Sequence, residues 1–176
     1  MPYNKLVLDH QYHLSYHLRY QTAQGILVDE LPVVPDASPD YDATIFQKQL
    51  VILYRDRLGN LMLQTAGKRS QLLRSRNTGR ARITALRLLE HRFHLYALYI
   101  LHFQEQRLLC FQNLARLSEA PQVIAQCSDD HYLVVTEDYE HFSLFFIGKN
   151  NVLFHRRFGT SWSSANAIMT PAPSLQ

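Results

Sequence analysis

The residues whose types and spacing could do chemistry in this chain lie mainly between Gly67 and Arg92. This segment holds eight basic residues and one acidic residue, a net charge of +7, whereas the other positions hold ten basic and fourteen acidic residues, a net charge of −4. Arginine presents a planar fork of N–H donors that suits phosphate, and a run of arginines can follow a charged backbone. We therefore expect nucleic acid or another polyanion to bind there. The candidate binding residues are Lys68, Arg69, Arg74, Arg76, Arg80, Arg82 and Arg87.

The same separation of charge is compatible with a protein-interaction role. An accessory protein of adaptor or toxin-neutralising type would bind one specific acidic partner, because complementary charge speeds association and selects the partner. A homo-oligomer formed through an exposed edge strand such as 152–158 is also compatible with the residues, although nothing in them requires it.

Patterns that resemble catalytic motifs fail in their details. The run from Gly67 to Ser70 has no glycine five residues before it and no hydroxyl side chain directly after the lysine, both of which a phosphate-binding loop needs. The run from Gly159 to Ser163 lacks the final glycine of a nucleophile elbow. One catalytic hypothesis is left, with His91 or His94 as general base for a phosphate-bearing substrate. The sequence favours a non-enzymatic binding module without a cofactor.

Three histidines near the N-terminus raise the question of a metal site. On a helix, His10, His13 and His17 would share one face, and the last two could hold one ion. The surrounding residues alternate between apolar and polar from Tyr12 to Tyr20, which is typical of a half-buried strand. On a strand, His13 and His17 lie about 13 Å apart, so we predict no metal ligands here.

The elements that would position these residues are mostly strands. Alternation predicts a strand over Tyr12–Tyr20, and a glycine turn predicts a hairpin of Gln49–Tyr54 with Leu61–Gln64. Apolar residues on both faces predict a central strand over Phe93–Phe103. A second hairpin is expected from Phe142–Ile147 and Val152–Phe158.

The remaining segments predict loops and short helices. The prolines and acidic residues of Asp29–Asp42 indicate an extended loop, and Gly67–Gly79 has little periodicity. The spacing of Ile83, Leu86 and Leu89 predicts a short amphipathic helix over Arg80–Arg92. A brief helix is expected over Asn113–Ala120, before Pro121.

These elements together predict an α+β fold: a mainly antiparallel sheet of meander-type hairpins, with seven to nine strands and two or three short helices. We expect one domain over residues 1–160 and a poorly ordered tail over 161–176. No internal repeat is detectable. The composition, 47% apolar and 19% charged, is that of an ordinary globular protein.

Two further features concern the cellular context. The cysteines, Cys110 and Cys127, are too few for a disulfide scaffold, and Cys110 lies in an apolar run that predicts a buried thiol. No apolar run reaches the length of a membrane span, and the N-terminus lacks the hydrophobic stretch of a signal peptide. We therefore expect a cytoplasmic protein that does not enter a membrane.

Overall fold

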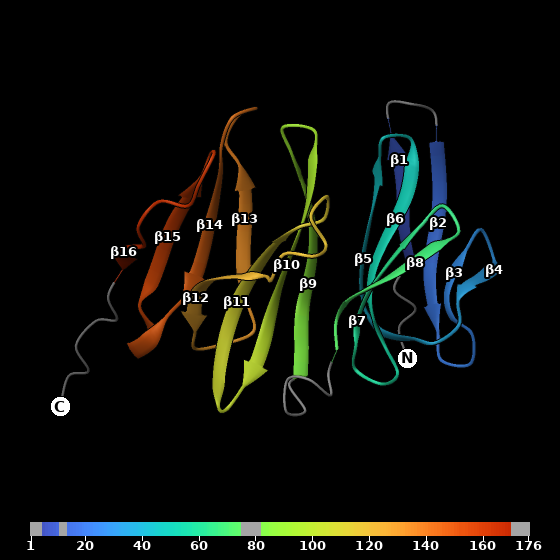
Figure 1. Cartoon of the computed structure of the whole chain (residues 1–176), viewed down its shortest axis with the longest axis horizontal. Helices are drawn as coiled ribbons and strands as arrows, with labels where there is room; N and C mark the ends of the chain where they lie inside the picture. The colour runs from blue at the N-terminus through green and yellow to red at the C-terminus, as the bar shows by residue number, and fades with distance from the viewer. Residues whose placement is uncertain (1–4, 11–13, 75–81, 170–176) are drawn as a thin grey trace. The chain divides into compact units, whose positions relative to one another are not determined.

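The computed structural model describes residues 5–10, 14–74 and 82–169, which form sixteen β-strands and one 3-10 helix, Lys149–Asn151 (Figure 1). The strands make four antiparallel sheets of four strands each, and strands that follow one another in sequence are neighbours in the sheet. This up-and-down order is the topology of a β-propeller blade. The predicted α+β class is wrong, because no α-helix occurs among the described residues.

The strands are distributed over the four sheets in chain order. The first sheet contains β1 (Lys5–His10), β2 (Leu14–Gln21), β3 (Gly25–Val28) and β4 (Leu31–Val34). The second contains β5 (Ala37–Phe46), β6 (Gln49–Asp56), β7 (Leu61–Thr65) and β8 (Lys68–Leu73). The third contains β9 (Arg82–His91), β10 (His94–Phe103), β11 (Gln106–Asn113) and β12 (Gln122–Cys127). The fourth contains β13 (Tyr132–Thr136), β14 (Phe142–Ile147), β15 (Leu153–Phe158) and β16 (Asn166–Met169).

The chain divides into two compact units, Met1–Leu88 and Leu89–Gln176, with the boundary inside β9. In the N-terminal unit the first two sheets share an apolar core, in which Leu18 and Ile26 of the first sheet meet Ile52 and Tyr54 of the second. These four side chains are 0–1% exposed. Burial of large apolar side chains between two sheets is the main force that holds such a pair together.

The C-terminal unit has an aromatic core. Phe158 lies 4.9 Å from Phe111, 5.0 Å from Phe142 and 5.0 Å from Trp162, measured between ring centroids. Tyr96 stacks on Phe111 at 4.7 Å. Because these residues come from both the third and the fourth sheet, the cluster joins the two sheets. Trp162 lies within the predicted tail, of which the structure describes residues up to Met169, including β16.

The helix predicted over Arg80–Arg92 is wrong, since its described part from Arg82 forms β9. Ile83 and Leu86 are both buried, three residues apart, and Ala85 between them has a left-handed φ of 55°. Such an irregularity breaks the two-residue alternation of a strand and imitates helical spacing. The helix predicted over Asn113–Ala120 is also wrong, because the residues after β11 form turns up to Pro121.

The loops predicted over Asp29–Asp42 and Gly67–Gly79 are wrong where the structure describes strands. β4 and most of β5 fall in the first segment, and β8 falls in the second. Pro32 lies in β4 and Pro39 in β5, which are both edge strands of their sheets. Edge strands tolerate proline because one side of the backbone makes no ladder hydrogen bonds.

Several strand predictions are confirmed. The described part of the alternating segment forms β2, the two predicted hairpins are β6–β7 and β14–β15, and the central strand is β10. The first two residues of the alternating segment, Tyr12 and His13, lie outside the described residues. The fourfold recurrence of one sheet topology was not visible in the sequence, because the first strands of the four sheets begin at the uneven positions Lys5, Ala37, Arg82 and Tyr132. Within the described ranges, no helix is long and apolar enough to cross a membrane.

Candidate functional site

The described basic residues of the predicted site lie on two strands. Lys68 and Arg69 begin β8 and Arg74 directly follows it, whereas Arg82 and Arg87 lie on β9. All five side chains are exposed. Two further candidates, Arg76 and Arg80, lie outside the described residues.

Arg69 has a structural role. One of its terminal nitrogens lies 3.1 Å from a carboxylate oxygen of Asp36, and its guanidinium lies over the ring of Tyr54, 5.9 Å from the ring centroid. Arg69 pairs with Gln64 on β7, on the face of the second sheet that meets the first sheet. Its charge is therefore partly used within the N-terminal unit.

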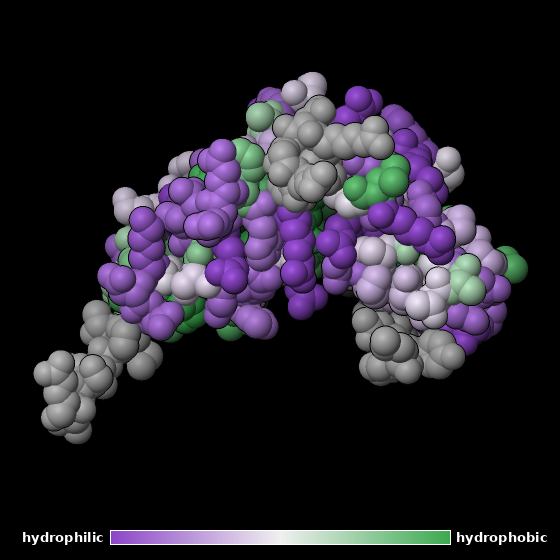
Figure 2. All heavy atoms as spheres, turned by 90° about the horizontal axis from the view of Figure 1, so that it is seen from below, coloured by the Kyte–Doolittle hydropathy of each residue, from purple (hydrophilic) through white to green (hydrophobic). Residues whose placement is uncertain are grey.

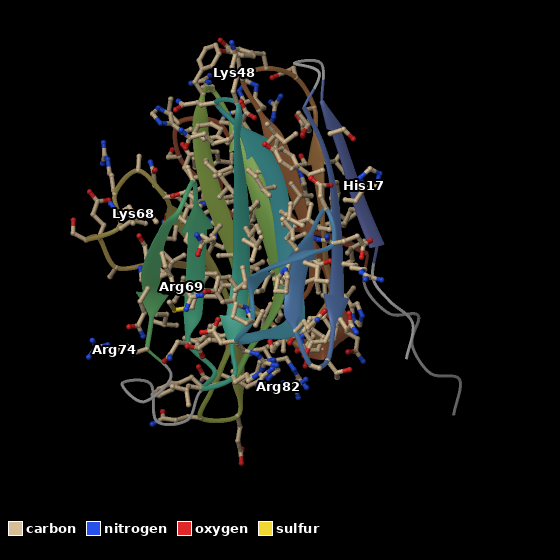
Figure 3. All side chains as sticks on the ribbon, turned by 90° about the vertical axis from the view of Figure 1, so that its right-hand side faces the viewer. His17, Lys48, Lys68, Arg69, Arg74 and Arg82 are labelled. Carbon is tan, nitrogen blue, oxygen red and sulfur yellow. The ribbon has the colours of Figure 1, made fainter. Side chains whose placement is uncertain are left out.

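The structure places Lys68 and Arg74 at opposite ends of β8. Six residue steps of about 3.3 Å separate them by about 20 Å. In Figure 3, Arg74 and Arg82 lie at the lower end of the unit, whereas Lys68 lies higher, toward the end where Lys48 is found. The predicted basic residues thus do not form one cluster. Among the described ones, Arg74 and Arg82 lie at the same end of the N-terminal unit.

A further arginine, Arg57, belongs to the same end. It is exposed in the turn between β6 and β7, and the pairing of Leu61 with Leu73 sets that turn beside Arg74. The neighbouring Asp56 directs its carboxylate into the turn, where it accepts the backbone N–H groups of Leu58 (2.9 Å) and Asn60 (2.8 Å). Sequence reasoning missed Arg57 because it lies outside the basic segment. The one feature of the sequence that could have pointed to Arg57 is the predicted β6–β7 hairpin, because its turn contains this residue.

The described basic residues differ in whether a carboxylate neutralises them. Arg19 is paired with Glu30, a nitrogen of Arg55 lies 2.8 Å from Asp40, and one of Arg157 lies 2.7 Å from Glu137. Within the described part of the chain, Arg57, Arg82, Arg87 and Lys68 form no ion pair with a carboxylate. Burial raises the pKa of Asp42, and Arg87 lies close enough to this carboxyl group to act in the opposite direction.

Figure 2 shows the molecule from below, and hydrophilic residues cover most of its visible described surface. Exposed guanidinium groups that are not neutralised by neighbouring carboxylates keep their attraction for anions from solution. Arg57 and Arg82 are two such groups at this end.

The fourth sheet contains a polar cluster that the sequence did not reveal. The hydroxyl of Ser143 lies 2.6 Å from Nε2 of His155 and also donates to a carboxylate oxygen of Glu137. In a nucleophilic triad the carboxylate would orient the histidine, but Glu137 here contacts the serine itself. Ser143 is 2% exposed, so a substrate cannot reach its hydroxyl. The cluster is a structural hydrogen-bond network within the sheet.

The histidines proposed as general bases do not lie in an accessible cleft. His91 is buried in the aromatic core, 5.3 Å from Phe142 between ring centroids. His94 is exposed on β10, with its ring 6.3 Å from that of Tyr96. Neither lines the grooves beside Lys48, Leu133 or Lys149, and the ring of His91 is too deeply buried for a substrate to reach, so the structure gives the catalytic hypothesis no support.

The thiols and the N-terminal histidines complete the set of candidate reactive groups. Cys110 and Cys127 are free and buried, which confirms the prediction for Cys110. Burial raises the pKa of both thiols to about 12, so the reactive thiolate is scarce at neutral pH. His17 lies on β2 with its Nδ1 3.3 Å from a carboxylate oxygen of Asp29. No group of three or more potential metal ligands occurs among the described residues.

Comparisons with known proteins add a distant structural likeness. No family model and no curated protein matches this chain. Among solved structures it is similar to AofleA from Arthrobotrys oligospora, with a TM-score of 0.45 and 13% identity over 93% of this chain. A triple arginine-to-alanine mutant of AofleA gives the same TM-score and identity. The chain spans about half of the length of that protein, 52% and 53% in the two structures. At this identity the likeness assigns neither a family nor a function.

Proposed function

We propose that this protein binds nucleic acid through the end of its N-terminal unit that carries Arg57, Arg74 and Arg82. The proposal rests on the exposure of these arginine side chains and on whether a carboxylate neutralises their charge. Arg57 and Arg82 are exposed and form no ion pair with a carboxylate among the described residues, whereas Arg19, Arg55 and Arg157 each hold one. Contacts of guanidinium with phosphate supply most of the affinity in binding of this kind and carry no sequence preference.

The affinity should fall steeply with salt, because each neutralised phosphate releases condensed counterions. The slope of log K against log salt is about −0.9 per phosphate on duplex DNA. We expect a labelled oligonucleotide, single- or double-stranded, to bind nuclease-treated protein at about 50 mM salt and to bind it much more weakly at about 200 mM. Fluorescence anisotropy measures both affinities.

The variant Arg74→Ala/Arg82→Ala tests the location of the site. It should weaken binding by about tenfold or more and flatten the salt slope by nearly 2, because two phosphate contacts are removed. Arg57→Ala should flatten it by about 1. The matched control is Arg116→Ala/Lys149→Ala, which removes the same charge from exposed positions of the C-terminal unit. Equal weakening by the control would show that net charge alone attracts the oligonucleotide, and no binding at the lower salt would end the proposal.

An acidic protein partner would contact the same cations. Comparing an oligonucleotide with an acidic peptide therefore distinguishes a nucleic-acid-binding protein from a protein that binds an acidic partner. An acidic peptide of the same net charge as the oligonucleotide should bind more weakly, because carboxylates on a flexible chain lack the regular spacing of phosphates. A peptide that binds more tightly than both oligonucleotides would instead favour an accessory or adaptor role with one protein partner.

A further inference from the structure

The first and second sheets leave an open groove beside the turn that joins β5 and β6. Its volume is about 290 Å³, at the small end of the range for ligand pockets, and all its lining residues belong to the N-terminal unit. Tyr16 of β2 lines it from the first sheet, and Leu50 and Ile52 of β6 line it from the second. Ile52 belongs to the apolar core between the two sheets, and Tyr16 and Leu50 pack against that core. The groove is therefore an extension of the core that is open to the surface.

Lys48 and Gln64 bring polar groups to this groove. Gln64 on β7 pairs with Ile52, so its side chain lies on the face of the second sheet that meets the first. Its side-chain amide forms no hydrogen bond with any residue that the structure describes. Lys48 lies in the β5–β6 turn and provides an ammonium group, whose three N–H donors can hold a carboxylate besides another neighbour. None of the described residues that line the groove is acidic.

This combination of groups selects an anion with an apolar body. A positive charge without a neighbouring carboxylate in the lining attracts anions, and one lysine balances a single negative charge. Inorganic phosphate would leave the apolar walls at Tyr16 and Ile52 uncovered. A neutral apolar molecule would cover these walls but would remove water from Lys48 and Gln64 without replacing its hydrogen bonds.

We propose that the groove binds a small organic carboxylate. The ammonium of Lys48 and the amide N–H groups of Gln64 hold its carboxylate, and its apolar body lies against Tyr16 and Ile52. A few polar groups that orient a ligand within mainly apolar walls are typical of small-molecule sites. Figure 3 shows Lys48 at the end of the unit opposite to Arg74 and Arg82. The carboxylate site is therefore separate from the surface proposed for nucleic acid.

Titration of the ¹⁵N-labelled full chain with phenylacetate tests the proposal by nuclear magnetic resonance. The side-chain amide signals of Gln64 and the backbone amide signal of Gly67, which also lines the groove, should shift and reach a plateau. We expect a dissociation constant of about 1 mM or below, because a ligand of this size makes few contacts. Phenylacetamide has the same ring without the charge, and acetate has the charge without the ring. Both should bind more weakly by about tenfold or more.

The variant Lys48→Met locates the anion contact. It should weaken phenylacetate binding by about tenfold or more, because an ion-paired hydrogen bond is lost, and leave phenylacetamide binding unchanged. Lys68→Met is the matched control. Lys68 pairs with Thr65, next to the pair of Gln64 with Arg69, so its side chain lies on the opposite face of the second sheet. This control removes the same charge and should bind phenylacetate as the unsubstituted chain does.

The same spectra show whether each variant is folded, because a folded chain keeps its dispersed amide signals. Absence of a saturable shift with phenylacetate would overturn the proposal. Equal weakening by Lys48→Met and Lys68→Met would overturn it too, because it would show a response to net charge alone. Neither result depends on whether the chain binds an oligonucleotide through Arg74 and Arg82.

Discussion

His91 is a titratable residue that is buried among aromatic side chains. It is 5% exposed, its ring packs edge-on against Phe142 and Phe158, and Nε2 has no hydrogen-bond partner among the described residues. Burial lowers the pKa of this histidine, and the positive charge of Arg92 lowers it further. The folded chain therefore favours the neutral form of His91.

This state predicts a loss of stability in mild acid. The pKa of His91 is lower in the folded chain than in the unfolded chain, so the unfolded chain takes up the proton more readily as the pH falls below about 6.5. We expect the free energy of unfolding, measured with urea, to decrease between about pH 7.5 and about pH 5.5, and to decrease less in His91→Phe. His131→Phe is the control, because the side chain of His131 is 90% exposed. The same pH dependence in His91→Phe and in the unsubstituted chain would contradict the expectation.

At the scale of the elements, the side chain of Asp42 on β5 forms a hydrogen bond with the backbone of β9. The carboxylate of Asp42 accepts the backbone N–H of Leu88 at 2.7 Å and that of Ala43 at 3.0 Å. Burial raises the pKa of Asp42, although these hydrogen bonds and Arg87 act in the opposite direction. The carboxylate thus meets a backbone donor near the irregularity at Ala85, where the regular alternation of β9 is interrupted.

Loss of this attachment should be measurable. In Asp42→Ala, the Leu88 N–H loses its acceptor, and we expect the free energy of unfolding to fall by about 1–3 kcal/mol. Asp40→Ala is the matched control, because its partly exposed ion pair with Arg55 should contribute less than about 1 kcal/mol. Urea denaturation followed by circular dichroism compares the two variants. Equal losses would show that β9 is held by other contacts.

At the scale of the whole molecule, the two units have cores made of different residues. Leu18 is 0% exposed in the core of the N-terminal unit, and Leu144 is 0% exposed in the C-terminal unit. Trp162 is the single tryptophan of the chain and lies in the aromatic core of the C-terminal unit. Its fluorescence therefore follows the unfolding of that unit, while circular dichroism follows both units.

Separate cores predict separate responses to substitution. Leu18→Ala and Leu144→Ala should each cost about 2–5 kcal/mol, because each leaves a cavity in a close-packed core. We expect Leu144→Ala to lower the urea midpoint of Trp162 fluorescence, and Leu18→Ala to lower the circular-dichroism midpoint while shifting the fluorescence midpoint less. Equal shifts of the fluorescence midpoint in both variants would show that the two units unfold as one cooperative unit.

The sequence by itself determined the features that depend on local patterns. The alternation from Tyr12 to Tyr20 predicted β2, the glycine turn predicted the β6–β7 hairpin, and the apolar run from Phe93 to Phe103 predicted a central strand. It also located the basic segment and the buried thiol of Cys110. These features could be predicted because the two-residue period of a strand, or a cluster of like charges, lies within a few neighbouring residues.

Only the tertiary structure decided the features that depend on pairing between strands. The left-handed residue Ala85 made β9 look helical, and edge positions allowed the prolines of β4 and β5 to lie in strands. The register of β7 with β8 set Arg57 beside Arg74 and left Lys68 at the far end. The contact of Ser143 with His155 follows from the register of β14 with its neighbours. Such pairings depend on the packing of the whole sheet, because the residues of one strand do not by themselves specify which strand will pair with it.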